Sequence, residues 1–489
     1  MNKIWTRQES KERFPQAISP LGWSILATPT EAALKGVENA FGLKNINRNR
    51  VVRRIDGYIY TAKGFFSNKK NWEFHFVALV KLVLVALFCV FRELICIDRF
   101  SFRYRFERRF FSILFEKSLF HLIKSWEATK SGLIAKMSAN YNGDLEKHRL
   151  DGAQFFSQDF TVYFFKNFVG RLLKQGLKDL GIESPSEVLK KLSSGHARNF
   201  SSQMALDFAD ERLSYEELMN RYGHLTDNWD IYAPTLRELS KLPRDFSRFE
   251  RIHQDLKLRQ QERILETEKI LKSCRSNKNF VQLILYFEEL LLIDEELRAF
   301  SSLQYPELKK IFRNLEKKFG LASNDIYFLT IEEIQSGHIS LQTIKKRRSE
   351  YRAACAISPP FELREEANGK YSAVEDKSTK AHLTGEGASA GIAKGRALIV
   401  ETINDIRRME ADSILVIRSP TPTYAAYYSF CRGIVSETGG SLSHGAIVAR
   451  EFGIPMVSDV NDALMHIRDG DEIEVNGNEG VVKNYAELR

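Results

Sequence analysis

Apolar residues recur every three or four positions through the middle of the chain. This spacing is typical of amphipathic helices, because it places the apolar side chains on one face. It holds over most of residues 150–355, and Ser184, Pro185 and Glu187 together are typical of a helix start. The most regular stretches are residues 205–222, 236–273, 278–300 and 306–319. We therefore predict a large, mainly α N-terminal domain over residues 1–357.

The pattern changes after this helical part. Residues 358–382 lack periodicity, carry many charges and begin with a pair of prolines, so we expect a flexible linker. Short apolar runs typical of strands then alternate with helical segments. The expected strands are residues 397–400, 413–417, 433–435, 455–457 and 472–475, and the expected helices are residues 402–411, 444–452 and 461–467. Residues 383–489 should thus form a C-terminal α/β domain, which makes the fold class multidomain. A short strand is also expected at residues 55–60.

Two segments near the N-terminus are strongly apolar or aromatic. Residues 76–91 are 16 residues long and contain Lys81. A membrane-spanning helix needs about 20 residues, so a buried core helix is expected here. Residues 99–126 are dense in Phe and Arg. They form either an amphipathic helix with its rings inside and its arginines in water, or a basic aromatic surface for a membrane or a lipid-like substrate. Membrane-surface contact through residues 76–126 therefore stays open as an alternative.

The composition is that of a soluble globular chain, with 43% of its 489 residues hydrophobic and 28% charged. The five cysteines are far apart, and none has the spacing of zinc ligands. The first nine residues contain no apolar signal core. We therefore expect reduced thiols, no metal site and a cytoplasmic, at most membrane-peripheral, location.

The charge is unevenly distributed along the chain. Residues 380–489 contain 11 Lys and Arg against 15 Asp and Glu, whereas residues 1–379 contain 61 against 48. The basic part can attract either the acidic part or an anionic ligand. No nucleic-acid reader motif accompanies the positive charge, so nucleic acid is not expected as a partner.

A glycine-rich loop joins an expected strand to an expected helix within residues 433–457. Gly439 and Gly440 let the backbone approach a ligand closely. His444 falls at the helix N-terminus, where free N–H groups and the helix dipole stabilise a phosphoryl group. Three hydroxyl side chains lie near the same point: Thr438, Ser441 and Ser443. A neutral imidazole is a nucleophile near pH 7, so His444 is the candidate catalytic residue.

The full run GIVSETGGSLSHGAIVAREFGIPMV resembles the phosphohistidine signature of phosphoenolpyruvate-utilising enzymes. This is the mobile, swivelling domain of pyruvate phosphate dikinase, phosphoenolpyruvate synthase and rifampicin phosphotransferase. The resemblance covers residues 383–485, and Gly445 stands where alanine is common. It implies that His444 carries a phosphoryl group between two sites as the whole domain rotates. Arg450 would then be a phosphate partner, or alternatively an ion-pair partner of Glu451 or a neighbouring residue on the helix surface.

The N-terminal part resembles the substrate-binding domain of rifampicin-phosphotransferase-like proteins more weakly. The resemblance rests on residues 5–24, 222–238 and 325–351, and Leu225 replaces an arginine that is common there. It implies an acceptor site, with candidate residues His224, Asp230 and Arg237. The alternative is that these residues form a hydrogen-bonded helix junction.

Relatives of this kind normally carry an ATP-grasp domain that charges the histidine. Residues 1–355 show neither its glycine-rich loop nor its acidic Mg²⁺ ligands, and no P-loop. We therefore expect a donor site on a separate ATP-grasp protein. That site would use Mg-ATP and give AMP and phosphate, or would use phosphoenolpyruvate, and this chain would hold no tightly bound cofactor.

The expected function is a phosphotransferase component that delivers the group to a small-molecule acceptor. The basic aromatic segment would suit an amphipathic or anionic acceptor. Two alternatives come from other classes. One is a non-catalytic regulator whose partner binding depends on the state of His444, and the other is a membrane-surface protein with a relic swivelling domain.

Overall fold

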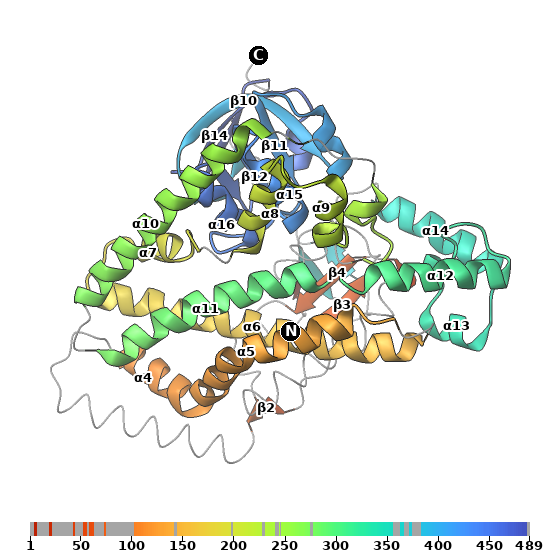
Figure 1. Ribbon diagram of the computed structural model, residues 1–489, viewed down its shortest axis with the longest axis horizontal. Helices are drawn as coiled ribbons and strands as arrows, with labels where there is room; N and C mark the ends of the chain where they lie inside the picture. Colours follow the sequence, from red (N-terminus) through yellow and green to blue (C-terminus); the bar gives the residue numbers. More distant parts are fainter. Residues whose placement is uncertain are drawn as a thin grey trace.

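Three long helices form the base of the molecule. They are α5 (Lys117–Met137), α6 (Leu145–Asp179) and α11 (Lys278–Phe300), and Figure 1 shows α11 lying along α6. Their apolar faces share one core, in which side chains such as Phe165, Phe287 and Leu290 are fully buried. The computed structural model describes residues 4–6, 19–21, 43–44, 52–55, 58–62, 73–74, 102–140, 144–196, 199–226, 230–239, 244, 246–273, 277–355, 362–365, 371–373 and 383–486.

The remaining helices of the N-terminal part cover the ends and upper side of this base. They are α4 (Phe102–Phe111), the π-helix η2 (Ser112–Glu116), α7 (Pro185–Leu192), α8 (Phe200–Ala209), α9 (Tyr215–Tyr222), η3 (Leu236–Glu238), η4 (Phe246–Arg248), α10 (Phe249–Ser273), α12 (Tyr305–Phe319), η5 (Ile326–Phe328), α13 (Ile331–Ser336) and α14 (Leu341–Cys355). The mainly helical N-terminal domain is thus confirmed. The expected helix 205–222 is two helices, because Ser214 and Glu217 form a capping box that starts α9.

The aromatic segment after residue 101 contributes phenylalanine rings to the hydrophobic core. Phe110, Phe111 and Phe115 are buried, and the ring of Phe111 stacks on Phe168 with 5.7 Å between centroids. The interior placement of the rings is therefore confirmed for these residues. The expectation that the arginines face water is wrong for Arg108. Its side chain is buried, and its guanidinium bonds both carboxylate oxygens of the nearby Glu116. Residues 76–91 lie outside the described residues, and no helix within the described ranges is long and apolar enough to span a membrane.

Part of the expected linker belongs to a sheet with N-terminal strands. The strand order is β3 (Val52–Ile55), β4 (Tyr58–Ala62), β1 (Ile4–Thr6), β6 (Glu362–Glu365) and β7 (Tyr371–Ala373), with every pair antiparallel. The prediction of a flexible linker is therefore wrong for residues 362–365 and 371–373. Leu363 is buried against the helical core, so this short alternating run has an apolar side chain to anchor it. The expected strand 55–60 is a hairpin in which Ile55 lies opposite Tyr58. A separate two-stranded sheet pairs β2 (Leu43–Lys44) with β5 (Glu73–Phe74).

The C-terminal domain is an eight-stranded mixed sheet with short helices, as expected. The strand order is β8 (Leu383–Thr384), β15 (Val481–Asn484), β14 (Glu472–Asn476), β10 (Ile392–Val400), β11 (Ser413–Ile417), β12 (Gly433–Ser436), β13 (Met456–Ser458) and β9 (Glu386–Ser389). Strands β10 to β13 are parallel. The helices are η6 (Ile403–Arg408), α15 (Pro422–Tyr428), α16 (His444–Glu451) and α17 (Ala463–His466). Of these, α15 was not predicted.

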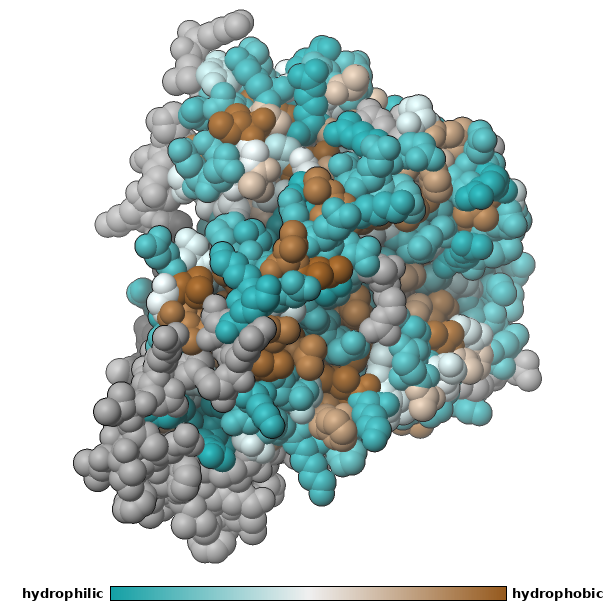
Figure 2. Space-filling view, turned by 60° about the vertical axis from the view of Figure 1, so that its left-hand side comes forward, coloured by the Kyte–Doolittle hydropathy of each residue, from teal (hydrophilic) through white to brown (hydrophobic). Residues whose placement is uncertain are grey.

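The C-terminal domain packs directly on the helical part, as Figure 1 shows for α15 and α16 against α8. We call this boundary the seam: it joins α15 and α16 to α8, α10, α11 and the residues that follow α7. One apolar cluster runs across it, and Phe208 and Tyr427 meet there edge to face with centroids 6.1 Å apart. The face drawn in Figure 2 carries apolar patches among polar side chains. Leu258 and Leu265 of α10 are exposed. The seam therefore combines apolar packing with the polar contacts described next.

Candidate functional site

His444 is the first residue of α16, directly after the loop that follows β12. The helix cap is Ser443, whose hydroxyl accepts a hydrogen bond from the Ala446 N–H at 3.4 Å. The predicted place of His444 at a helix N-terminus is therefore what the structure shows. The imidazole is buried, and His444 as a residue is only 3% exposed.

The loop before His444 needs its glycines. Gly439 has a φ of +100°, a conformation that favours glycine. A Cβ on Gly440 would lie 3.0 Å from a carboxylate oxygen of Glu386, and that oxygen accepts the Ser441 N–H at 3.0 Å. Thr438 is buried, and its hydroxyl has no hydrogen-bond partner within the described part of the chain. The loop thus leaves one buried hydroxyl of the predicted group uncommitted.

Steric crowding by Pro420 explains why residue 445 is a glycine. A Cβ at this position would lie only 2.2 Å from Cβ of Pro420, far inside van der Waals contact. The loop containing Pro420 follows β11 and passes directly over the start of α16. The glycine that stands where alanine is common in the resembling sequences is therefore required by this chain's own packing.

Two residues of the helical part hold the His444 imidazole. Nδ1 lies 2.5 Å from Oε2 of Glu295 on α11, and Nε2 lies 2.8 Å from Oγ of Ser201 on α8. The Ser201 hydroxyl also lies 2.7 Å from Oε1 of Glu295. All three side chains are buried, with Ser201 at 0% and Glu295 at 4% exposure. They form a closed triangle across the seam.

The hydrogen-bonding capacities of these groups fix how the ring is oriented. An ionised carboxylate can only accept, so Nδ1 must carry a hydrogen and donate it to Glu295. Nε2 is then the ring nitrogen that faces Ser201. In a neutral imidazole Nε2 has a free lone pair, and the single hydroxyl hydrogen serves either Nε2 or Glu295. In a protonated imidazole Nε2 donates to the hydroxyl, which donates onward to Glu295. Glu295 thus leaves Nε2 as the ring nitrogen that faces Ser201.

A second carboxylate lies at the other end of α16. Glu451 is fully buried, accepts hydrogen bonds from the Ser202 hydroxyl and from the Gly195 N–H, and has the Glu295 carboxylate nearby. Burial, followed by the negative charge of Glu295, raises the pKa of Glu451 well above its ordinary value. The seam therefore contains two buried acidic side chains, of which Glu295 bonds His444.

Arg450 joins the two domains but does not contact His444. Its guanidinium donates to the hydroxyls of Ser193 and Ser194 and to the carbonyls of Ala388 and Ser441, at 2.7 to 3.0 Å. Burial lowers its pKa to about 10. The expected surface ion pair with Glu451 is not formed. A role as a phosphate partner stays a prediction, because in this arrangement the guanidinium is fully engaged at the seam.

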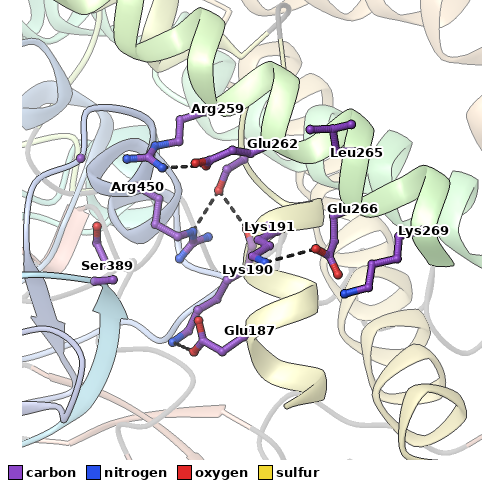
Figure 3. A pocket seen from close by; sticks show the side chains of 13 residues that line it. Glu187, Lys190, Lys191, Arg259, Glu262, Leu265, Glu266, Lys269, Ser389 and Arg450 are labelled. Atoms are coloured by element: carbon purple, nitrogen blue, oxygen red, sulfur yellow. Dashed lines mark hydrogen bonds and ion pairs between the residues drawn. The ribbon is translucent and has the colours of Figure 1, made fainter. Parts of the chain in front are cut away.

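Arg450 also lines a cavity between the two domains. The cavity has a volume of about 480 Å³, and Figure 3 shows Arg450 extending between Ser389 and the lysines of α7, with Arg259 and Glu262 of α10 nearby. Its lining residues are Glu187, Lys190, Lys191, Ser194, Arg259, Glu262, Leu265, Glu266, Lys269, Ser389, Ala390, Arg450 and Gly453. The three glutamates each pair with a cation: Lys190 with Glu187, Lys191 with Glu266, and Arg259 with Glu262.

The three predicted acceptor-site residues have other partners, and none bonds His444 in the structure as described. His224 is buried beside α9, with Nε2 3.0 Å from the Ala299 carbonyl, and burial lowers its pKa to about 4. Asp230 accepts hydrogen bonds from the backbone and the hydroxyl of Ser19. Arg237 is largely exposed and pairs with Glu216 at 3.0 Å. These contacts are those of the alternative, a hydrogen-bonded helix junction, and an acceptor role stays a prediction.

Metal ligands are not grouped in the described part of the chain: no cluster of three or more His, Cys, Asp or Glu side chains there could hold an ion. The two cysteines that the structure describes, Cys355 and Cys431, are free thiols.

Sequence reasoning missed Ser201 and Glu295, and it noticed Glu451 only as a neighbour of Arg450. One signal was available for Glu295. It lies between Asp294 and Glu296 in the second half of α11, a helix rich in leucine and isoleucine, and buried acids are rare unless they have partners. Its neighbour Asp294 has such partners, Lys166 at 2.6 Å and Arg298 at 3.2 Å. Nothing in the sequence indicates that the partner of Glu295 lies 149 residues away.

Residues 409–480 match the family model described as the mobile domain of PEP-utilising enzymes, where PEP is phosphoenolpyruvate. Over these residues the C-terminal domain is similar to that mobile domain. His444 and its loop lie inside the matched residues.

The curated relatives match over the same end of the chain. Rifampicin phosphotransferase of Bacillus subtilis is 32% identical over 168 residues, which cover 33% of this chain and 19% of that protein. The uncharacterised phosphotransferase YvkC of the same organism is 35% identical over 171 residues, covering 32% and 21%. This chain therefore spans about a fifth of the length of these relatives. An NMR structure of Enzyme I aligns with 48% of this chain and 76% of that one, at 17% identity and a TM-score of 0.17, and it adds nothing to the fold assignment.

Proposed function

We propose that this chain is a phosphotransferase component in which His444 carries a phosphoryl group on Nε2. The observation that carries the proposal is the setting of the imidazole. It lies at the first residue of α16, Glu295 holds the Nδ1 hydrogen, and Nε2 faces the helical domain. The family match and the phosphotransferases among the relatives support phosphoryl transfer as the class of chemistry.

The proposed reaction has two steps. At the donor site, the lone pair of Nε2 attacks phosphorus, the bond from phosphorus to the donor oxygen breaks, and the first N–H groups of α16 stabilise the transferred group. At the helical domain, an acceptor oxygen attacks phosphorus and the P–N bond breaks. The electron pair then returns to Nε2, which takes up the proton that the acceptor hydroxyl loses. Once the phosphoryl group has left, Glu295 holds the Nδ1 hydrogen of the discharged ring again and stabilises positive charge on it.

The donor and acceptor belong to the proposal as well. We place the donor site on a separate ATP-grasp protein that converts Mg-ATP to AMP and phosphate, with phosphoenolpyruvate as the other donor to test. The acceptor is a small molecule with a hydroxyl or enolate oxygen. The positive charge of residues 1–379 favours an anionic acceptor.

Labelling of the purified chain tests this proposal. The chain is incubated with Mg²⁺ and ATP labelled on the β-phosphate, and separately with labelled phosphoenolpyruvate, each with and without host extract. We expect acid-labile label on the wild-type chain in the presence of extract, and none on His444→Ala. Label that persists in His444→Ala would contradict the assignment of the carrier residue. Absence of label with either donor, in a folded chain, would contradict phosphoryl carriage.

One observation favours a second function, that of a regulator. Nε2 of His444 touches a protein hydroxyl and is buried, so no small-molecule acceptor lies beside it in the docked arrangement. In a regulator, the phosphoryl group would stay on the protein and change its binding to a partner. Fractionation of the reaction separates the two functions. Label that moves to a small molecule indicates a transferase, whereas label that remains on the chain indicates a regulator.

A further inference from the structure

Docking of the C-terminal domain depends on the chemical state of the His444 ring. We infer that the surface formed by Ser201 and Glu295 accepts only the unphosphorylated imidazole, so that a phosphoryl group on Nε2 opens the seam. The inference rests on the proposed function in one respect, because it requires that His444 be phosphorylated. Its structural basis is the direct contact between His444 and the helical domain.

The first reason is steric. Nε2 and the Ser201 oxygen are already at hydrogen-bond distance, 2.8 Å, and Ser201 has no exposed surface. A tetrahedral phosphoryl group bonded to Nε2 would have to occupy the position of the Ser201 hydroxyl. Protein interiors are closely packed and side chains can yield only a little. The phosphorylated ring therefore cannot keep its place between α8 and α11.

The second reason is electrostatic. A phosphoryl group brings about one and a half to two negative charges at pH 7 and disrupts a buried contact beside acidic side chains. Here it would meet the carboxylate of Glu295, which lies 2.7 Å from the same Ser201 hydroxyl. Two buried cations of α6 and α11, Lys166 and Arg298, are already bonded to Asp294, the residue before Glu295. The site that holds a neutral or cationic ring thus repels a dianion.

The third reason is that the affected contacts belong to one helix. His444, Arg450 and Glu451 all lie on α16, and each bonds a residue of the helical part. Displacement of the first turn of α16 therefore strains the contacts at its other end. The apolar contact between Phe208 and Tyr427 opposes opening, so the seam has two states whose balance the phosphoryl group shifts. The structure corresponds to the discharged state.

The test compares exchange at the seam before and after phosphorylation. The full chain is phosphorylated chemically with phosphoramidate, and the phosphohistidine is quantified by its acid lability. Hydrogen exchange is then followed by mass spectrometry in α8 and α16. We expect at least tenfold faster exchange in both helices of the phosphorylated fraction, and no change in His444→Ala treated in the same way. Phosphorylated chain with unchanged exchange would overturn the inference.

A pair of variants provides a second arm that needs no phosphorylation. His444→Glu places a negative charge at the seam and should speed exchange in α8 and α16 at least tenfold relative to the neutral His444→Gln. In the His444→Glu background, the carboxylate introduced at position 444 and that of Glu295 repel each other. Glu295→Gln removes one of these two charges and should restore protection from exchange. Glu296→Gln is the matched control, because Glu296 is the next residue on α11 but bonds Trp126 and Lys130 instead. Equal exchange in His444→Glu and His444→Gln would overturn the inference.

The outcomes also separate this inference from the proposed function. Seam opening by chemical phosphorylation, without labelling from ATP or phosphoenolpyruvate, would leave the inference standing and contradict phosphoryl carriage. Enzymatic labelling of His444 without faster exchange would support phosphoryl carriage and overturn the inference. Acid-stable phosphate on Ser201 would show that the contact is a transfer contact, and it would overturn the inference as well.

Discussion

Replacement of Glu295 by glutamine should weaken the docking of the C-terminal domain. The carboxylate accepts hydrogen bonds from Nδ1 of His444 and from the hydroxyl of Ser201. A glutamine retains one acceptor oxygen but brings an NH₂ group, which cannot accept either hydrogen. The change therefore removes one buried hydrogen bond to a charged group, which contributes about 1.5 to 3 kcal/mol. That corresponds to a shift of about 10- to 150-fold in the opening equilibrium of the seam.

Native-state hydrogen exchange of α8 measures this opening directly, because exchange reports local as well as global unfolding. We expect amides of residues 200–209 to exchange about 10- to 150-fold faster in Glu295→Gln. Ser201→Ala should have a smaller effect, about 0.5 to 1.5 kcal/mol, because it removes a neutral donor. The matched control Glu296→Gln should exchange in α8 as the wild type does. If Glu295→Gln and Glu296→Gln behave alike, the contact between Glu295 and His444 does not hold the seam.

Three further predictions concern the same boundary. Because the pKa of Glu451 is raised in the folded chain, its protonated form stabilises the seam fully below the ordinary pKa of 4.5, and this contribution is lost as the pH rises through the raised value. α8 should therefore exchange faster as the pH is raised from 5 to 9, beyond the intrinsic pH effect, and Glu451→Gln should flatten this dependence. Gly445→Ala should destabilise the C-terminal domain, because the added Cβ overlaps Pro420. The overlap costs about 1 to 3 kcal/mol, and the gain in helix propensity offsets about 1 kcal/mol of it. Chemical denaturation followed by circular dichroism would show an unchanged or higher midpoint if this reasoning is wrong. Arg237→Gln should leave the transfer of label from His444 to the small-molecule fraction unchanged, since Arg237 pairs with the exposed Glu216. Loss of this transfer with His444 still labelled would support the acceptor-site interpretation instead.

The C-terminal domain could be predicted closely because its determinants are local. Short apolar runs mark the parallel strands, and Ser443 and His444 mark the start of α16. The same local signals predicted most helices of the N-terminal part. The exact ends of the helices were predicted less well. A helix start such as Ser214, the N-cap of α9, can lie within a continuous apolar pattern.

The surroundings of His444 could not be predicted, because they depend on contacts between distant segments. Ser201 lies in a short, mostly buried helix, and Glu295 lies between two other acidic residues, so neither belongs to a recognisable motif. Their meeting with His444 requires the relative placement of two domains. The linker prediction failed at β6 for the same reason. This strand forms by pairing with β1, which lies near the start of the chain.

The distribution of charge across the seam bears on how the domain can move. Apolar packing alone, as between Phe208 and Tyr427, would hold the domain without regard to the state of His444. Buried ionisable groups contribute little net stability, since desolvation offsets their attraction. They do make the contact depend on charge and protonation, because each change leaves a buried group unpaired or adds a like charge. Glu295 therefore gives the seam a sensitivity to the state of His444, and Glu451 gives it a sensitivity to pH, that apolar residues of the same volume would not provide.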